Sequence, residues 1–160
     1  MEIERRWLVQ DWPNLSPAAT FYMEQGYFST RPAIRIREEA LEGGTTAYVL
    51  CFKGGAGLVR EEIEISVDRD RYQRLKAMLG KPMIQKEQHR YPLPGGFTLE
   101  VNSVDPHLET GFFYAAVEFP DAASALAWTP PEDLKASLSQ AVTGQPGESM
   151  AAYWARTRTE

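Results

Sequence analysis

The first strand-like segment of the chain carries charged side chains at every second position. Glu2, Glu4 and Arg6 alternate with apolar and basic residues within residues 2–9. Because side chains alternate across a β-strand, these three would share one face. Carboxylates are ligands for hard divalent cations and guanidinium groups bind phosphate oxygens. The spacing therefore fits metal–phosphate chemistry, although an ordinary ladder of cross-strand salt bridges is the better explanation of this segment taken alone.

The same alternation recurs along the chain, and seven of eight strand-like segments pair an apolar face with a face that carries charge. Taken one strand at a time, a solvated sheet face is the simpler interpretation. Eight antiparallel strands are, however, enough to close a barrel, and helices over the apolar faces would leave the charges inside, where a ligand must help neutralise them. The later charged positions on these faces are Arg35, Arg37, Lys53, Arg60, Glu62, Glu64, Lys86, Arg90, Glu100 and Glu118.

Turn residues and hydrophobic periodicity set the expected elements. Asp68 is positioned to cap a helix through Leu79 that Gly80 ends, and helical patterns follow at 121–128, from Pro130 onward and at 147–155. We therefore predict an α+β fold in one domain, residues 1–160, with an eight-stranded antiparallel β-barrel covered by helices. The expected strands are 2–9, 21–28, 33–39, 46–53, 60–67, 83–92, 97–102 and 113–119.

Composition excludes several classes of protein. The 160 residues include 17 Lys and Arg against 22 Asp and Glu, a net charge of −5, which argues against a nucleic-acid binder held by bulk electrostatics. The lone Cys51 allows no intrachain disulfide. Residues 1–10 lack a signal-peptide pattern and no run of eighteen apolar residues occurs, so we predict a cytoplasmic protein.

An ordered series of short motifs resembles the CYTH family, the triphosphate tunnel metalloenzymes. Residues 2–9, EIERRWLV, resemble the opening ExExK signature of that family. ExExK alone is a weak pattern, and the ordered series is far more specific. The further matches are QGYF at 25–28, RIR at 35–37, FKG at 52–54, REEIE at 60–64, Lys86 at the start of KxR, EVN at 100–102, VEF at 117–119, and AVT at 141–143 with Tyr153.

The resemblance implies an antiparallel tunnel that binds triphosphate with Mg²⁺ or Mn²⁺, and short chains of this kind look most like bacterial inorganic triphosphatases. It assigns Glu2 and Glu4 to the substrate-bound metal and Glu62, Glu64 and Glu118 to a second metal or its water. Arg6 and Tyr27 stand where the family's Lys–Tyr pair helps to generate the nucleophile. The residues implied to grip phosphate are Arg6, Arg35, Arg37, Lys53, Arg60 and Lys86, and Arg90 shares their face outside the motifs.

Four positions depart from the family pattern. Arg6 replaces the lysine of ExExK, and arginine keeps its proton at any relevant pH, so it binds phosphate but cannot act as a base. Gln88 stands where KxR has arginine, and Asn102 replaces the aspartate of EVD. Ala116 replaces a carboxylate commonly found two residues before Glu118. The second metal site is the feature that these losses weaken most.

The leading hypothesis is divalent-metal-dependent hydrolysis of inorganic triphosphate or a related triphosphate inside the tunnel. The alternative is a degenerate tunnel that binds polyphosphate or a nucleotide without turnover. A class IV type adenylate cyclase is less well supported, since no motif reports a pocket for adenine and ribose. We expect a triphosphate-containing small molecule as partner, no specific nucleic-acid binding and no membrane association, and a homodimer is compatible with this interpretation.

Overall fold

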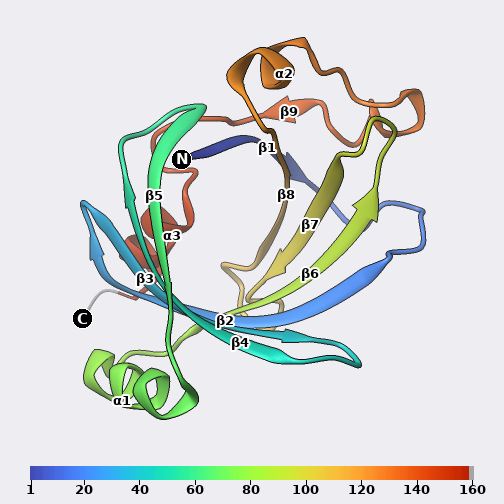
Figure 1. The fold of residues 1–160 in the computed structure, drawn as a ribbon. Helices are drawn as coiled ribbons and strands as arrows, with labels where there is room; N and C mark the ends of the chain where they lie inside the picture. The colour runs from blue at the N-terminus through green and yellow to red at the C-terminus, as the bar shows by residue number, and fades with distance from the viewer. Residues whose placement is uncertain (159–160) are drawn as a thin grey trace.

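The computed structural model, which describes residues 1–158, is a closed antiparallel β-barrel of α+β class (Figure 1). Eight strands hydrogen-bond in the order β5-β4-β3-β2-β6-β7-β8-β1, and β1 pairs again with β5 to close the wall. The predicted fold class is confirmed. The strands are β1 (Glu2–Val9), β2 (Ala19–Thr30), β3 (Ala33–Leu41), β4 (Thr46–Gly54), β5 (Val59–Ser66), β6 (Ile84–Pro92), β7 (Thr98–Val104) and β8 (Phe112–Glu118).

The closing seam between β1 and β5 is short. Glu2 pairs with Arg60 and Ile3 with Val59, and the same edge of β1 then pairs with β9 (Gln140–Ala141). The sequence did not predict β9, because two residues are too few to show a period-two pattern. The seam brings the first residues of β1 beside the first residues of β5, so both charged segments face the same interior.

Helix α1 (Arg69–Leu79) covers the outer surface of the barrel wall over β2, β3 and β4, as predicted. The Asp68 side chain caps its first turn, and Gly80 ends it in the left-handed conformation at φ 66°. Tyr72, on the side of α1 that faces the barrel, is fully buried beside Ile36. A Cβ at Gly26 would lie 2.5 Å from a Leu79 methyl group, so glycine there permits the close approach of helix and strand.

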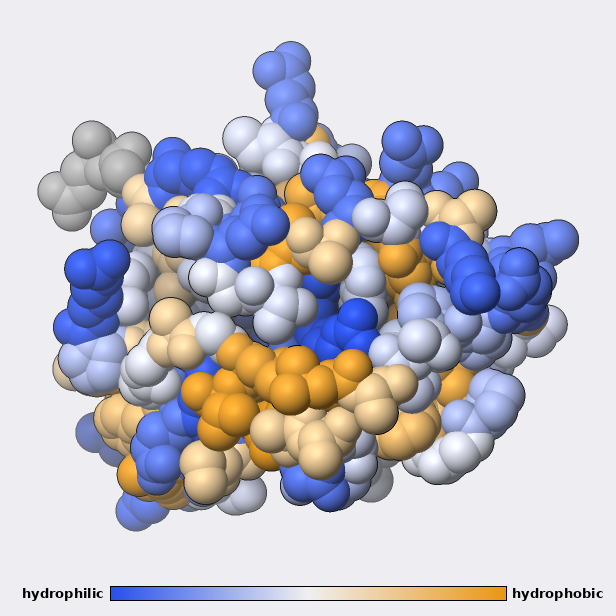
Figure 2. Space-filling model, turned by 90° about the horizontal axis from the view of Figure 1, so that it is seen from above, coloured by the Kyte–Doolittle hydropathy of each residue, from blue (hydrophilic) through white to orange (hydrophobic). Residues whose placement is uncertain are grey.

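The chain beyond β8 is less helical than expected. Helix α2 (Ala122–Ala127) packs on β1, and the helix expected from Pro130 onward is a single 3₁₀ turn, Glu132–Leu134. Viewed from above, apolar side chains gather on the face where α2 lies, and Leu126 of this helix is 77% exposed (Figure 2). No helix among residues 1–158 has the length and apolar character needed to cross a membrane.

Helices do not cover the whole barrel, which corrects one sequence expectation. Val59, Ile63 and Ile65, on the outward face of β5, are 40–55% exposed. The reason is that α1 leaves the end of β5 and packs back over β2, β3 and β4. The apolar face of β5 therefore stays uncovered within the described chain.

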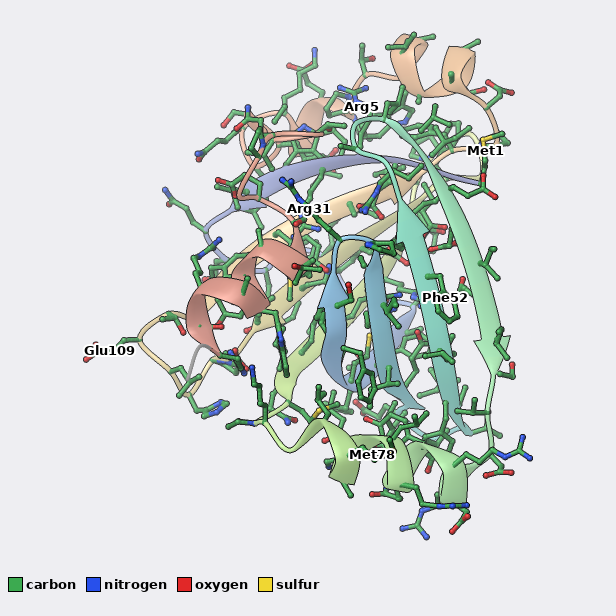
Figure 3. The ribbon with its side chains drawn as sticks, turned by 90° about the vertical axis from the view of Figure 1, so that its left-hand side faces the viewer. Met1, Arg5, Arg31, Phe52, Met78 and Glu109 are labelled. Atoms are coloured by element: carbon green, nitrogen blue, oxygen red, sulfur yellow. The ribbon has the colours of Figure 1, made fainter. Side chains whose placement is uncertain are left out.

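Helix α3 (Met150–Thr157) packs against β2 and contributes to the wall of the interior. Figure 3 shows it at the end where the β2–β3 turn carries Arg31, whereas α1, marked by Met78, lies along the wall. Met150 and Trp154 pack in one cluster with Tyr27 and Tyr114 from the interior. The helix thus fixes the position of inward-facing side chains.

A buried ion pair anchors α3 to the barrel. Arg158 Nη1 lies 2.8 Å from Asp105 Oδ2, and the Tyr153 hydroxyl donates to the same oxygen at 2.6 Å. Arg158 also donates to the carbonyls of Pro82 and Met83. Burial alone would raise the pKa of Asp105, but the hydrogen bonds from Arg158 and Tyr153 outweigh it and lower that pKa. The anchor therefore requires the ionised carboxylate.

We predict that Asp105→Asn lowers the free energy of unfolding by about 3 kcal/mol, because it leaves the buried Arg158 charge without a partner. Asparagine tolerates the positive φ of this position, 44°, so the change isolates the charge. Urea denaturation measures the loss, which should shrink as the pH falls through the low pKa of Asp105, where the wild type also loses its carboxylate. Asp70→Asn, which alters the exposed pair with Arg74, should cost less than about 1 kcal/mol. Equal losses in the two variants would contradict this account of the anchor.

Candidate functional site

The barrel encloses a cavity of about 750 Å³ whose wall is largely polar and charged. The period-two alternation of the strands turns one face of each strand toward it. The structure brings together every site residue expected from the sequence, although their roles remain predictions. Those lining the cavity are Glu2, Glu4, Arg6, Tyr27, Arg35, Arg37, Lys53, Arg60, Glu62, Glu64, Lys86, Arg90 and Glu118.

Three carboxylates converge at one point of the wall. One oxygen from each of Glu2, Glu4 and Glu118 lies within 4.8 Å of the others. The register explains the meeting, because Glu4 pairs directly with Glu118 across β1 and β8, and Glu2 follows on the same face of β1. Such a group of carboxylate oxygens has the chemistry that Mg²⁺, Mn²⁺ or Ca²⁺ prefers.

The electrostatics of these carboxylates differ. Desolvation by the barrel wall, followed by the negative charges of Glu100 and Glu4, raises the pKa of Glu118 to about 7, although its side chain is exposed to the cavity. Burial and the charge of Glu2 likewise raise the pKa of Glu4. Burial also opposes ionisation of Glu2, but Lys53 outweighs it and lowers the pKa of Glu2. A divalent cation would relieve the repulsion within the group.

One arginine on each of β1, β3 and β5 has buried guanidinium nitrogens that lack hydrogen-bond partners within the described chain. Buried nitrogen atoms of Arg6 (Nε and Nη2), Arg35 (Nε) and Arg60 (Nε) have no hydrogen-bond partner among the described residues. Arg35 is only 8% exposed. Buried donors are normally satisfied, and a buried cation without a counter-ion is costly. These groups are therefore positioned to bind an anion that enters the cavity.

Other cations of the wall already have partners. Lys53 Nζ lies 2.9 Å from Glu2 Oε2 and 3.4 Å from Glu62 Oε2. Arg37 bonds Glu39 at 3.1 Å and donates to the Gln25 side chain at 3.1 Å. The wall thus divides into cations held by carboxylates and cations that remain available.

Two of the four departures from the family pattern form one interacting pair. Gln88 and Asn102 lie opposite each other on β6 and β7, and the Gln88 amide donates to Asn102 Oδ1 at 2.9 Å. Arg90 donates to Gln88 Oε1 at 2.8 Å and lies 3.6 Å from Glu100. The two amides therefore satisfy each other at positions where an arginine and an aspartate were expected. The pair removes one charge of each sign together.

The remaining two departures lie side by side as well. Ala116 pairs with Arg6 on one side and with Glu100 on the other. An alanine at this position places no carboxylate opposite Arg6 across the β1–β8 pair. The convergence of Glu2, Glu4 and Glu118 does not depend on residue 116.

The sequence analysis did not single out Tyr114, which occupies a central position in the wall. The Arg6 guanidinium carbon lies 3.7 Å from the centre of its ring, and Lys86 Nζ lies 3.0 Å from its hydroxyl. Tyr114 has the same parity as Glu118 on β8, so its inward orientation could be predicted from the sequence. Its hydrogen-bond and ring partners could not, because they depend on cross-strand register. Tyr27 accepts instead from Gln25 at 3.2 Å, and no hydrogen bond joins Tyr27 to Arg6 within residues 1–158.

Comparison with known proteins supports the resemblance seen in the motifs. The chain is 29% identical over 133 residues to the inorganic triphosphatase of Nitrosomonas europaea. The matched region covers 81% of this chain and 83% of the relative. No protein-family model matches the chain.

Solved structures share the fold. The crystal structure of the inorganic triphosphatase NE1496 superposes with a TM-score of 0.62 at 24% identity, covering 96% of this chain and 93% of that chain. A protein from Hippeastrum, described as a putative adenylyl cyclase with a dominant triphosphatase activity, superposes with a TM-score of 0.61 at 16% identity, covering 100% and 98%.

The closed barrel with a cavity lined by both signs of charge has the fold of the inorganic triphosphatase NE1496. The ordered motifs and the 29% identity to the Nitrosomonas protein relate the chain to the CYTH/inorganic triphosphatase family.

We predict that the Glu118 carboxyl group titrates near pH 7 in metal-free protein, as read from its side-chain ¹³C chemical shift. Glu100→Gln should lower this pKa, because it removes the largest repelling charge. Glu61→Gln changes an outward, exposed residue of β5 and should leave it unchanged. Titration of Glu118 near the ordinary value of 4.5 would refute the electrostatic description of the cluster.

Proposed function

We propose that this protein hydrolyses inorganic triphosphate in its cavity, with Mg²⁺ or Mn²⁺ as cofactor. The observation that carries the proposal is the presence, in one cavity, of guanidinium groups with unpartnered nitrogens and a separate group of converging carboxylates. The relationship to an inorganic triphosphatase supports the same substrate class.

The available cations suit a polyphosphate chain. Arg6, Arg35 and Arg60 come from three different strands and all line the cavity, so they surround the space from more than one side. Guanidinium groups bind phosphate oxygens in planar, bidentate contacts, which favours a ligand with several oxygens. Arg37, Lys53 and Arg90 line the same cavity and would complete the positive wall.

The carboxylates would hold the cation. Glu2, Glu4 and Glu118 offer three oxygens close enough to ligate one ion, and the raised pKa values of Glu4 and Glu118 reflect charge that an ion would offset. When bound, the ion would neutralise negative charge that develops on the phosphate oxygens. Glu62 and Glu64 remain candidates for a second ion, although Lys53 already pairs with Glu62 at 3.4 Å.

The protein side chains would then supply orientation and charge. In phosphoryl transfer, catalysis depends on positioning and on stabilising charge spread over the equatorial oxygens. Arg6 is fixed over the Tyr114 ring, and its backbone N–H donates to Thr143 Oγ1 at 2.9 Å, so its direction is set from both ends. Arg6 can therefore bind and polarise the substrate, whereas Tyr27 offers a hydroxyl to the same cavity.

One specific observation supports the alternative of binding without turnover. Arg6 cannot accept a proton, and the Gln88–Asn102 pair carries no charge where the family has both an arginine and an aspartate. A cavity that binds polyphosphate or a nucleotide but does not hydrolyse it would have this composition.

Phosphate release from triphosphate, assayed with Mg²⁺ and with Mn²⁺, tests the proposal. We expect release by the wild type and a loss of at least ~100-fold in Glu4→Gln, which removes a central carboxylate charge. Glu61→Gln, on the outward face of β5, is the matched control and should retain wild-type rates.

Calorimetry with the same ligand separates the alternatives. Triphosphate binding without phosphate release under either metal would contradict hydrolysis and establish the binding function instead. Formation of cyclic AMP from ATP would identify a cyclase.

A further inference from the structure

In the proposed function the converging carboxylates of the cavity bind a cation, and Glu100 lies 3.6 Å from Arg90, so the basic side chains are candidate proton acceptors. Hydrolysis requires that a group take the proton which the attacking water loses. The arginines keep their protons, so none of them can serve. Lys53 lies 2.9 Å from Glu2 and 3.4 Å from Glu62, so two carboxylates already contact its amino group. Lys86 is the cavity lysine that remains.

Lys86 is placed among cations. It is 4% exposed, and none of the salt bridges among residues 1–158 includes it. Within the part of the chain that the structure describes, its one side-chain hydrogen bond joins Nζ to the Tyr114 hydroxyl at 3.0 Å. The charged and titratable groups that face it are Arg6 and Glu4 from β1, Arg35 and Arg37 from β3, Glu100 from β7 and Tyr114 from β8.

This environment favours the uncharged amine. An ammonium group removed from water loses its hydration, and nearby positive charges oppose it further. Burial and then the charges of Arg37, Arg35 and Arg6 place the pKa of Lys86 well below its usual value, and Glu100 offsets them only in part. An amine at this point can take a proton from a hydroxyl 3.0 Å away.

We propose that Lys86, as the amine, and Tyr114 form the proton-accepting pair for the water that attacks triphosphate. The inference rests on the proposed hydrolysis and names the residues that would replace a base at position 6. Both side chains line the cavity, so water bound beside a substrate phosphate can reach the Tyr114 hydroxyl.

The step balances without any further reactant. The water oxygen forms a bond to a terminal phosphorus, and the bridging P–O bond breaks with its electron pair leaving on diphosphate. The water proton passes to the Tyr114 oxygen as the Tyr114 hydroxyl proton moves to the Lys86 nitrogen. The resulting ammonium returns its proton to the products or solvent, which restores the amine.

Tyr114 is suited to pass a proton while keeping one of its own. Burial comes first among the causes that raise its pKa to about 12, so it stays protonated at neutral pH. Arg6 lies over its ring at 3.7 Å, and the Asn102 amide donates to its backbone carbonyl at 3.5 Å. These contacts hold the hydroxyl toward Lys86.

Lys86→Arg distinguishes proton transfer from charge alone. Arginine carries a permanent positive charge that can bind phosphate but cannot accept a proton, so we expect kcat to fall by about 100-fold or more while KM rises by no more than a few-fold. Tyr114→Phe keeps the ring under Arg6 and should lower kcat in the same way. The outer pair, in which Tyr72 and Lys76 both bond Glu24, supplies matched controls. Lys76→Arg and Tyr72→Phe should keep wild-type kcat.

A direct titration completes the test. In protein labelled with ¹³C at lysine Cε, Lys86 should titrate below the half-exposed Lys135. If Lys86 stays an ammonium ion up to the same pH as Lys135, or if kcat is unchanged in Lys86→Arg, the proposed role of Lys86 and Tyr114 as proton acceptors is wrong. No phosphate release by the wild type would overturn the proposed hydrolysis itself. Release by the wild type together with unchanged kcat in Lys86→Arg would overturn this inference alone.

Discussion

The enclosure of both signs of charge in one barrel is the constraint on which the rest of the structure depends. A sheet that closes on itself, with apolar residues outward, obliges carboxylates and guanidinium groups to share a low-dielectric interior. Part of that charge is neutralised internally, as where Lys53 binds Glu2 and Glu62. What remains is a set of carboxylates that can hold a cation and a set of arginines that can hold an anion, and this combination is the basis on which we propose a metal–polyphosphate site.

The scaffold around the cavity supports this division. Helix α3 packs Trp154 against Tyr27, and the Asp105–Arg158 ion pair fixes the helix to the barrel. The segment before α3 reaches the other side, where Thr143 accepts a hydrogen bond from the Arg6 backbone. Structural and functional groups are therefore separated. The Asp105–Arg158 ion pair is not part of the cavity wall, whereas the arginines with unpartnered nitrogens line the cavity.

The period-two alternation allowed the face of each charged residue to be predicted from the sequence, because parity depends only on position within a strand. Cross-strand partners depend on register, which parity does not reveal. The sequence therefore showed Gln88 and Asn102 as two separate losses, whereas the register makes them one hydrogen-bonded pair. Tyr114 was overlooked for the same reason, since its contacts with Arg6 and Lys86 come from strands distant in sequence. The exposed face of β5 also escaped prediction, because periodicity marks an apolar face but not the element that covers it.

A crystal structure of the protein with triphosphate and Mn²⁺ tests the central claim most directly. The account predicts an anomalous manganese peak within coordination distance of the Glu2, Glu4 and Glu118 carboxylates, and phosphate oxygens bonded to Arg6, Arg35 and Arg60. Manganese bound only outside the barrel, or triphosphate that leaves those arginine nitrogens without partners, would contradict it.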